Sequence, residues 1–207
     1  EMARLGLAAG TSGNVSVRCG EGFLISPSGM AYERLRPAHV VRMDWDAAFE
    51  GAVKPSSEWR LHRDILRARP DLSAVVHTHS RHATAVAILG RDIPAIHYMI
   101  AEAGGDTIRC APYAVFGIQA LADRVVAALA GRRACLMAHH GVIAAGATLG
   151  GALALSGTVE ELAAQYLALL PLGAPPVLGR AEMAEVMERF ETYGQQSAAV
   201  RESLPKR

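Results

Sequence analysis

The first part of the chain alternates short apolar runs with glycine-rich turns. Residues 15–18 alternate apolar and polar positions, a turn at 19–22 leads into an apolar run at 23–25, and residues 40–44 repeat the pattern. Short runs joined by tight turns predict paired β-strands. Residues 1–9 resemble the end of a helix closed by Gly10, so we expect a helix whose start precedes the sequence given.

Later segments carry the longer spacing of amphipathic helices. Leu61, Ile65 and Leu66 recur at helical intervals before Pro70, and Ser56 or Ser57 is expected to cap this helix. The mixture of helices and short strands predicts an α/β fold with three αβα layers around a mostly antiparallel sheet. We also expect helices over 81–89, 117–129, 149–169 and 181–193, strands over 73–79, 134–138 and 142–145, and a linker over 171–176.

Composition narrows the class of protein. The 207 residues suffice for one domain, predicted to span 1–207 with a flexible tail over 195–207. A net charge of +1 gives no reason to expect nucleic acid as a partner, and no apolar run approaches the length of a membrane span. The three cysteines, an odd number at wide spacings, predict neither disulfides nor a thiolate metal site and favour a cytoplasmic location.

Three histidines have the arrangement of metal ligands. His77 and His79 stand two apart on a predicted strand, which places both imidazoles on one face. His140 ends another predicted strand, just before a glycine. Such pairs often occur without a metal, but an unpaired imidazole at a buried strand end is costly, and three histidines with an open fourth position are typical of catalytic zinc. The run 77–82 also resembles a metallo-β-lactamase motif, but Arg81 stands where that motif needs a carboxylate.

Three segments offer hydroxyl groups and glycines suited to an anion. They are residues 11–14, 26–29 and 55–57, and the last precedes a predicted helix, whose N-terminus favours negative charge. Each is an ordinary turn or cap when taken alone. Spacing does not show whether the three converge.

Together these segments resemble the class II aldolase/adducin family from the first residues to the last predicted helix. The resemblance implies a zinc-dependent enzyme that forms a homotetramer with active sites between subunits and no nucleic acid or membrane partner. The matching stretches are residues 13–18, 27–29, 55–60, 75–79, 93–100, 110–113, 139–141 and 190–194.

The resemblance also assigns roles to single residues. His77, His79 and His140 match zinc ligands, with Mn²⁺ or Co²⁺ as other candidate ions, whereas His139 does not match. Glu58 matches a catalytic glutamate that also touches the metal. Tyr98 matches an acid/base tyrosine supplied by the neighbouring subunit. The phosphate-binding positions are Gly13, Asn14, Ser28 (a threonine in the family pattern), Gly29, Ser56 and Ser57, and an apolar aldehyde pocket comprises Phe116, Phe190 and Tyr193.

The activity implied is cleavage of a ketose 1-phosphate to dihydroxyacetone phosphate and a small aldehyde. The apolar pocket favours L-fuculose 1-phosphate, 5-deoxyribulose 1-phosphate or 5-methylthioribulose 1-phosphate, among which the sequence does not choose. The alternatives are dehydration of methylthioribulose 1-phosphate, decarboxylation of an oxo-tetronate phosphate, and epimerisation of a pentulose 5-phosphate, whose enzymes carry aspartate at the place of Glu58. A non-catalytic adducin-like module is a further alternative, although such modules lack the histidines.

Overall fold

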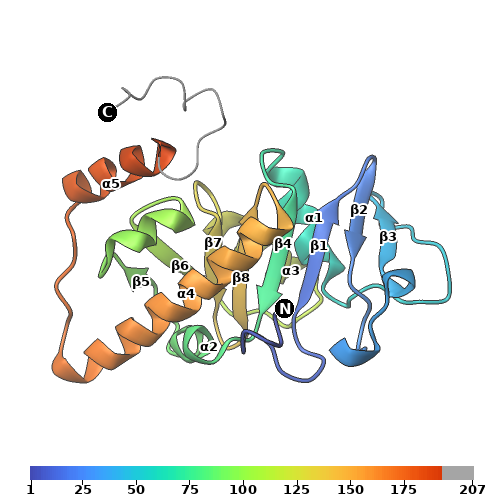
Figure 1. Cartoon of the computed structure of the whole chain (residues 1–207), viewed down its shortest axis with the longest axis horizontal. Coiled ribbons are helices and arrows are strands. Elements are labelled where there is room, and N and C mark those ends of the chain that lie inside the picture. Colours follow the sequence, from blue (N-terminus) through green and yellow to red (C-terminus); the bar gives the residue numbers. More distant parts are fainter. Residues whose placement is uncertain (193–207) are drawn as a thin grey trace, which may run out of the picture.

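One eight-stranded sheet organises the protein, for which the computed structural model describes residues 1–192 (Figure 1). The strand order is β3-β2-β1-β4-β8-β7-β6-β5. Only β6 and β7 pair in parallel; the other pairs are antiparallel, as the sequence predicted. The strands are β1 (Asn14–Arg18), β2 (Gly22–Ile25), β3 (Val41–Asp44), β4 (Ala74–Thr78), β5 (Ile93–Pro94), β6 (Thr107–Ala111), β7 (Ala134–Met137) and β8 (Gly141–Gly146).

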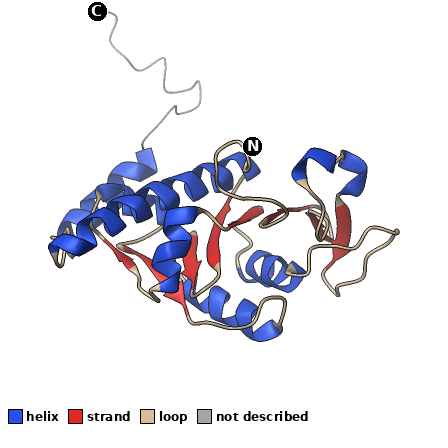
Figure 2. Ribbon diagram, turned by 90° about the horizontal axis from the view of Figure 1, so that it is seen from below, coloured by secondary structure: helices blue, strands red, loops and turns tan. Residues whose placement is uncertain are grey.

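Helices cover both faces of the sheet and complete the predicted αβα layering (Figure 2). Helices α1 (Trp59–Ala68) and α3 (Gln119–Ala128) pack on one face, whereas α2 (Arg81–Ile88) and α4 (Leu149–Leu169) pack on the other. Helix α5 (Arg180–Thr192) packs against η3 (Tyr98–Ala103). The short 3₁₀ helices η1 (Tyr32–Arg34), η2 (Pro37–His39) and η4 (Leu170–Leu172) lie in connections.

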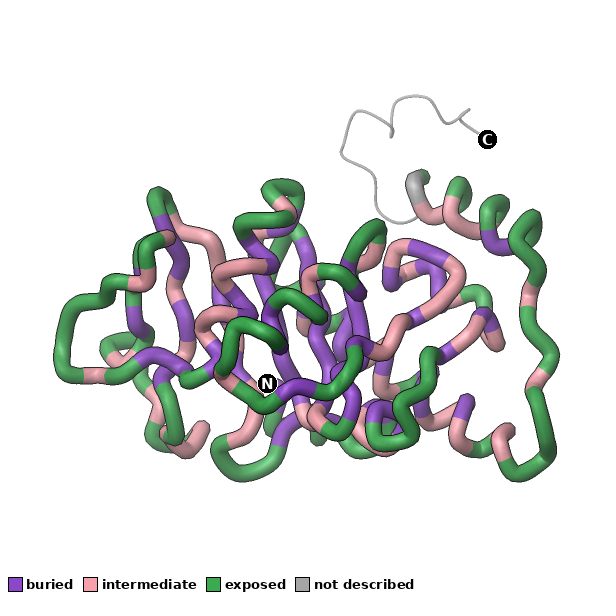
Figure 3. Tube along the Cα trace, turned by 180° about the vertical axis from the view of Figure 1, so that it is seen from behind, coloured by how far each residue is buried: buried purple, intermediate pink, exposed green. Residues whose placement is uncertain are grey.

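The central strands carry the core because they face a helix layer on each side. Every residue of β4, β7 and β8 is buried, and these strands form the purple centre of Figure 3. Alternate residues enter different cores: Val75 and Ile143 pack towards α1 and α3, and Leu136 and Val142 pack towards α2 and α4. This alternation fixes which strand residues face the site described below.

Two sequence predictions about helix ends are wrong. Residues 1–9 form hydrogen-bonded turns instead of a helix end, because Gly6 and Gly10 adopt left-handed φ angles of 71° and 62°. Helix α1 begins one residue after Glu58, which is its N-cap, and neither serine caps it; the Ser56 hydroxyl instead accepts a hydrogen bond from the Glu58 N–H at 3.3 Å. Strands β5 and β6 and helix η3 were not predicted.

The ends of the chain leave two expectations untested. The predicted tail over 195–207 lies outside the described residues, and the assignment of the whole chain to a single domain stays a prediction. Within residues 1–192, no helix is both long and apolar enough to cross a membrane.

Candidate active site

Three histidines meet where β4 ends and β8 begins. His77 lies on β4, two residues after Val75, and therefore faces the α1 side of the sheet. His79 follows the last residue of β4, so the prediction that it lies on the strand is wrong. His140 immediately precedes β8, whose second residue pairs with the last residue of β4. Antiparallel pairing thus brings residues far apart in the sequence to one end of the sheet.

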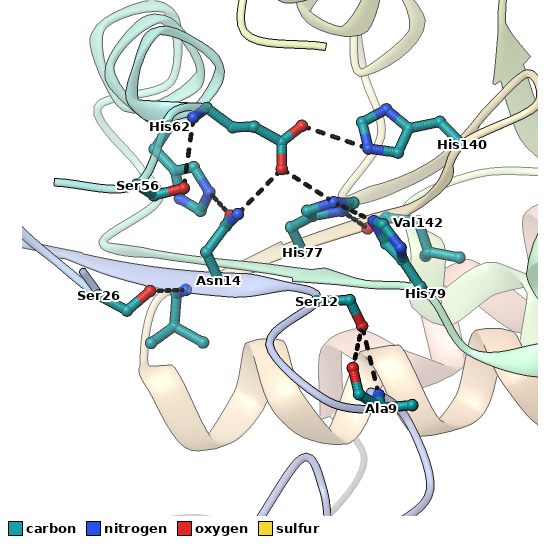
Figure 4. A network of polar contacts seen from close by, with 12 residues as sticks. Ala9, Ser12, Asn14, Ser26, Ser56, His62, His77, His79, His140 and Val142 are labelled. Atoms are coloured by element: carbon teal, nitrogen blue, oxygen red, sulfur yellow. Dashed lines mark hydrogen bonds and ion pairs between the residues drawn. The ribbon is translucent and has the colours of Figure 1, made fainter. Parts of the chain in front are cut away.

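The three rings point towards one another (Figure 4). One ligand atom from each of His77, His79 and His140 lies within 4.8 Å of the others. The Nε2 atoms of His77 and His79 are 2.9 Å apart. His139 does not belong to this cluster; its ring contacts Tyr113, with centroids 6.0 Å apart.

The hydrogen bonds and burial suit these rings to a cation. A backbone carbonyl only accepts, so the contact of 2.9 Å between His77 Nδ1 and the Val142 oxygen places the ring proton on Nδ1. The Nε2 lone pair of His77 then faces the other two rings. Burial lowers the pKa of both His79 and His140 to about 4, which leaves them neutral at pH 7. Neutral imidazoles are the form that binds metals.

Glu58 completes the cluster with a buried carboxylate. Its Oε2 atom lies 3.2 Å from His77 Nε2 and accepts a hydrogen bond from Asn14 Nδ2 at 3.0 Å, and its Oε1 atom lies 3.3 Å from His140 Nε2. Burial raises the pKa of Glu58, but positive charge at the His77 and His140 positions and the hydrogen bond from Asn14 hold it below its ordinary value. The carboxylate is therefore ionised.

This donor set fits a divalent cation. Imidazole lone pairs and a carboxylate converge, and such an arrangement is repulsive unless a positive charge lies between them. Glu58 Oε1 is buried without a hydrogen-bond partner among the described residues, and this leaves it available for such a charge. Three histidines and one carboxylate oxygen are typical ligands of zinc.

A cavity of about 370 Å³ joins this cluster to all three of the hydroxyl- and glycine-rich segments. The loops at 26–29 and 54–56 are held together by a bridge between Pro27 and Pro55 and by the hydrogen bond from Ser56 N to the Ser26 oxygen. No Lys or Arg is among the described residues that line the cavity, so an anion there would be held by hydroxyls and backbone N–H groups. The lining comprises Thr11, Ser12, Gly13, Asn14, Pro27, Ser28, Gly29, Ser56, Ser57, Glu58, His79, Tyr113, Ala114, Phe116, His139 and His140.

Gly13 allows the first of these segments to approach β4. Its φ of 78° is left-handed, and a Cβ atom there would lie 2.7 Å from the backbone oxygen of His77. Only glycine fits both conditions. The next residue, Asn14, pairs with His77 across the β1–β4 ladder, so this segment lies directly beside the histidine cluster.

Not all of the predicted site residues line this cavity. Phe116 does, and it is 63% exposed at the rim. Tyr98 and Phe190 stack on each other between η3 and α5, with centroids 6.3 Å apart, and line a different cavity of about 600 Å³. Tyr193 lies outside the described residues. The roles assigned to these aromatic residues stay predictions.

Sequence reasoning missed several residues near the site. Tyr113 and His139 line the cavity without an assigned role. Ser16 and His62 lie behind Glu58 and Asn14 in a hydrogen-bonded network. Their spacing carried a usable signal, because residues 14 and 16 share a strand face and residue 62 lies one helical turn after residue 58 at the start of α1.

Comparison with known proteins identifies the class. The family model of the Class II Aldolase and Adducin N-terminal domain matches residues 1–167, and the chain belongs to this family. The predicted fold class, activity class and family resemblance are thereby confirmed: the chain is a class II aldolase, a metal-dependent lyase.

Individual relatives cover nearly the whole chain. A 5-methylthioribulose-1-phosphate/5-deoxyribulose-1-phosphate aldolase of Rhodospirillum rubrum is 52% identical over 94% of this chain and 88% of its own length. An L-fuculose phosphate aldolase of Escherichia coli K12 is 53% identical over 94% of this chain and 91% of its own length. A solved structure of L-fuculose 1-phosphate aldolase superposes with a TM-score of 0.89 at 37% identity, covering 92% of this chain and 91% of that one.

Proposed function

We propose that this aldolase cleaves a ketose 1-phosphate that ends in a methyl or methylthiomethyl group, releasing dihydroxyacetone phosphate and an aldehyde. The observation that carries the proposal is the single cavity in which the histidine cluster and Glu58 lie beside three segments suited to a phosphate. Relatives of similar identity act on such sugars.

Zinc is the proposed metal, with His77, His79, His140 and Glu58 as the residues that would hold it. A bound zinc ion would supply Lewis-acid polarisation of the ketose carbonyl and its adjacent hydroxyl. The donor set supports zinc because neutral imidazoles suit it, whereas Mg²⁺ and Ca²⁺ prefer oxygen ligands.

The remaining chemistry falls to the side chains. Loss of the C4 hydroxyl proton breaks the C3–C4 bond, and C3 must then receive a proton to give dihydroxyacetone phosphate. Glu58 is the proposed carrier of that proton, since its carboxylate lies within 3.3 Å of two of the histidines. The phosphate is proposed to lie against Gly13, Asn14, Ser28, Gly29, Ser56 and Ser57.

The proposal assigns the other end of the sugar to a second subunit. Tyr98 does not line the cavity that holds the histidine cluster of its own chain. We assign it to a neighbouring subunit's site, as acid/base for the aldehyde oxygen. We therefore keep the homotetramer as part of the proposal. A cytoplasmic location also belongs to it, because all three cysteines are unpaired.

The terminal group of the sugar distinguishes the candidate substrates. Phe116 is the proposed contact of the aldehyde end in this chain, with Phe190 and Tyr193 as further members of the apolar pocket. The relatives divide between L-fuculose phosphate and the two deoxypentulose phosphates, and all three sugars end in an apolar group. Comparison of kcat/KM on the three sugars would choose among them.

Turnover of purified protein tests the activity. At least one of the three sugars should give measurable release of dihydroxyacetone phosphate, followed by coupling to NADH oxidation. Glu58→Gln should keep the metal and lose at least about 100-fold in kcat, the usual scale of general acid–base catalysis. Glu21→Gln, in the exposed β1–β2 turn, is the matched control and should retain full activity. Unchanged turnover in Glu58→Gln would exclude the assigned role.

Metal analysis tests the centre separately. The purified chain should contain about one zinc ion per subunit, and His79→Ala should lose it. His139→Asn is the control for metal content, because His139 lies outside the cluster and asparagine tolerates its φ of 56°. A chain that binds no metal and releases no product would instead be an adducin-like interaction module.

A further inference from the structure

A fourth histidine lies fully buried behind the proposed catalytic carboxylate. His62 is 0% exposed and lies on the first turns of α1, four residues after Glu58, the N-cap of this helix. Asn14 and Ser16 stand two apart on β1 and face α1 from the sheet, in register with His77 and Val75 of β4. Figure 4 shows His62 and Asn14 in contact at this helix–sheet junction.

The chemistry of the groups fixes the direction of every hydrogen bond in this network. An ionised carboxylate only accepts, so Asn14 Nδ2 donates to Glu58 Oε2 at 3.0 Å, and the amide oxygen of Asn14 faces His62. That oxygen also only accepts, which places the imidazole proton on His62 Nε2. Nδ1 of His62 then accepts from the Ser16 hydroxyl at 2.7 Å.

The network requires a neutral imidazole with one defined tautomer. Burial lowers the pKa of His62 to about 3, so the ring is neutral at pH 7 and has one donor and one acceptor. Both are used, by Asn14 and Ser16 respectively. Each group from Ser16 to Glu58 therefore constrains the orientation of the next.

We propose that His62 is a positioning residue of the aldolase, which fixes the amide orientation of Asn14 and thereby holds the Glu58 carboxylate against the histidine cluster. The inference rests on the proposed role of Glu58. Without the Nε2 proton, the Asn14 amide oxygen would lose its donor at this buried position, and Glu58 alone would hold the amide in its orientation. The reversed amide would direct its oxygen at the carboxylate, where two acceptors repel each other.

Substitution of His62 tests this role with a kinetic pattern. His62→Leu removes both ring nitrogens and should lower kcat about 30-fold (~2 kcal/mol at 1.36 kcal/mol per tenfold), with bound zinc unchanged. His62→Gln offers an amide N–H in place of Nε2 and should recover most of this loss. His82→Gln, on the exposed side of α2, is the matched control and should behave as wild type. Equal losses in the Leu and Gln variants would overturn the proposal.

Two further measurements separate positioning from a merely structural role. In the Glu58→Gln background, His62→Leu should cost no further activity, because both changes remove the same carboxylate geometry. A multiplied loss would refute the coupling. Long-range ¹H–¹⁵N correlation spectra of the wild type should show the Nε2–H tautomer of His62, and the Nδ1–H tautomer would contradict the network.

The outcomes also stand if one variant fails to fold. The spectroscopic test needs only the wild-type protein. Ser16→Ala is a second variant: it leaves His62 Nδ1 without its hydrogen-bond donor and should lower kcat about fivefold. A wild type without aldol cleavage would refute the proposed function and not the network, because the tautomer is measured independently of turnover.

Discussion

Gly141, the first residue of β8, allows the packing around the histidine cluster to be tested with one methyl group. A Cβ atom at this position would lie 2.4 Å from the backbone oxygen of Thr78, 3.0 Å from His79 Cδ2 and 3.3 Å from His77 Cε1. Side-chain rotation cannot relieve the first contact, because both atoms belong to paired strands. Gly141→Ala must therefore shift the ends of β4 and β8 apart and displace two proposed ligands.

The expected cost follows from these contacts. Overpacking of a rigid interior costs about 1–3 kcal/mol, and the backbone contact places this variant at the upper end, about 3 kcal/mol. For a chain of this size that corresponds to a decrease in Tm of roughly 6–12 °C. Zinc affinity should also fall by about 10–100-fold, as it does when the support of metal ligands is disturbed.

Thermal unfolding and metal titration of the purified variant measure both effects. Gly157→Ala is the matched control: its Cβ meets nothing within 4 Å and it lies inside α4, so it should raise stability by about 0.5–1 kcal/mol and leave zinc affinity unchanged. A Gly141→Ala protein with wild-type Tm and zinc affinity would show that the ends of β4 and β8 are not packed as described.

Three other outcomes are expected. Removal of zinc by a chelator should lower Tm by about 5–10 °C, since a ligand at 100 times its Kd contributes about 2.7 kcal/mol, and added zinc should restore it. The metal-free protein should lose stability as pH falls below about 6.5, because the folded pKa values of His62 (about 3), His79 and His140 (both about 4) lie below the unfolded value of 6.5; the unfolded state binds more protons between these values, and each histidine contributes up to about 1.4 kcal/mol per pH unit. Urea unfolding at pH 7.5 and 5.5 checks this, and His62→Gln should reduce the difference. Phe116→Ser should narrow the preference for 5-deoxyribulose 1-phosphate over ribulose 1-phosphate by about tenfold in kcat/KM, whereas an unchanged ratio would remove Phe116 from the aldehyde pocket.

The long elements were predictable from composition and pattern, and the short ones built by tertiary contacts were not. Helix α4 matches its predicted range of 149–169, since a 21-residue helix needs no partner to be visible in the sequence. Strand β5 has two residues and η3 is a 3₁₀ helix, so neither repeats a pattern long enough to detect. The N-terminal turns were mistaken for a helix end because φ angles at two glycines decide them.

The candidate metal cluster followed from residue spacing, but its surroundings did not. Spacing placed His77 and His79 near each other, and the pairing of β4 with β8 brings His140 to them. Whether the three hydroxyl-rich segments converge depends on how loops pack, and the cavity that joins them is visible only in three dimensions. Tyr98 lines a different cavity of the same chain, and its proposed role in a neighbouring subunit's site stays a prediction.

The register of β1 against β4 bears on which sugar phosphate fits. Asn14 lies opposite His77, and directly paired residues in antiparallel strands are about 5 Å apart. Gly13, near the end of the proposed phosphate-binding segment 11–14, therefore immediately precedes the residue paired with His77. A phosphate on C1 is adjacent to the carbonyl at C2, so a ketose 1-phosphate spans this short interval when its carbonyl faces the histidines. A phosphate on C5 is separated from that carbonyl by three chain carbons. A one-residue slip of β1 would turn Asn14 away from Glu58, so the proposed preference for a 1-phosphate over a 5-phosphate depends on this pairing.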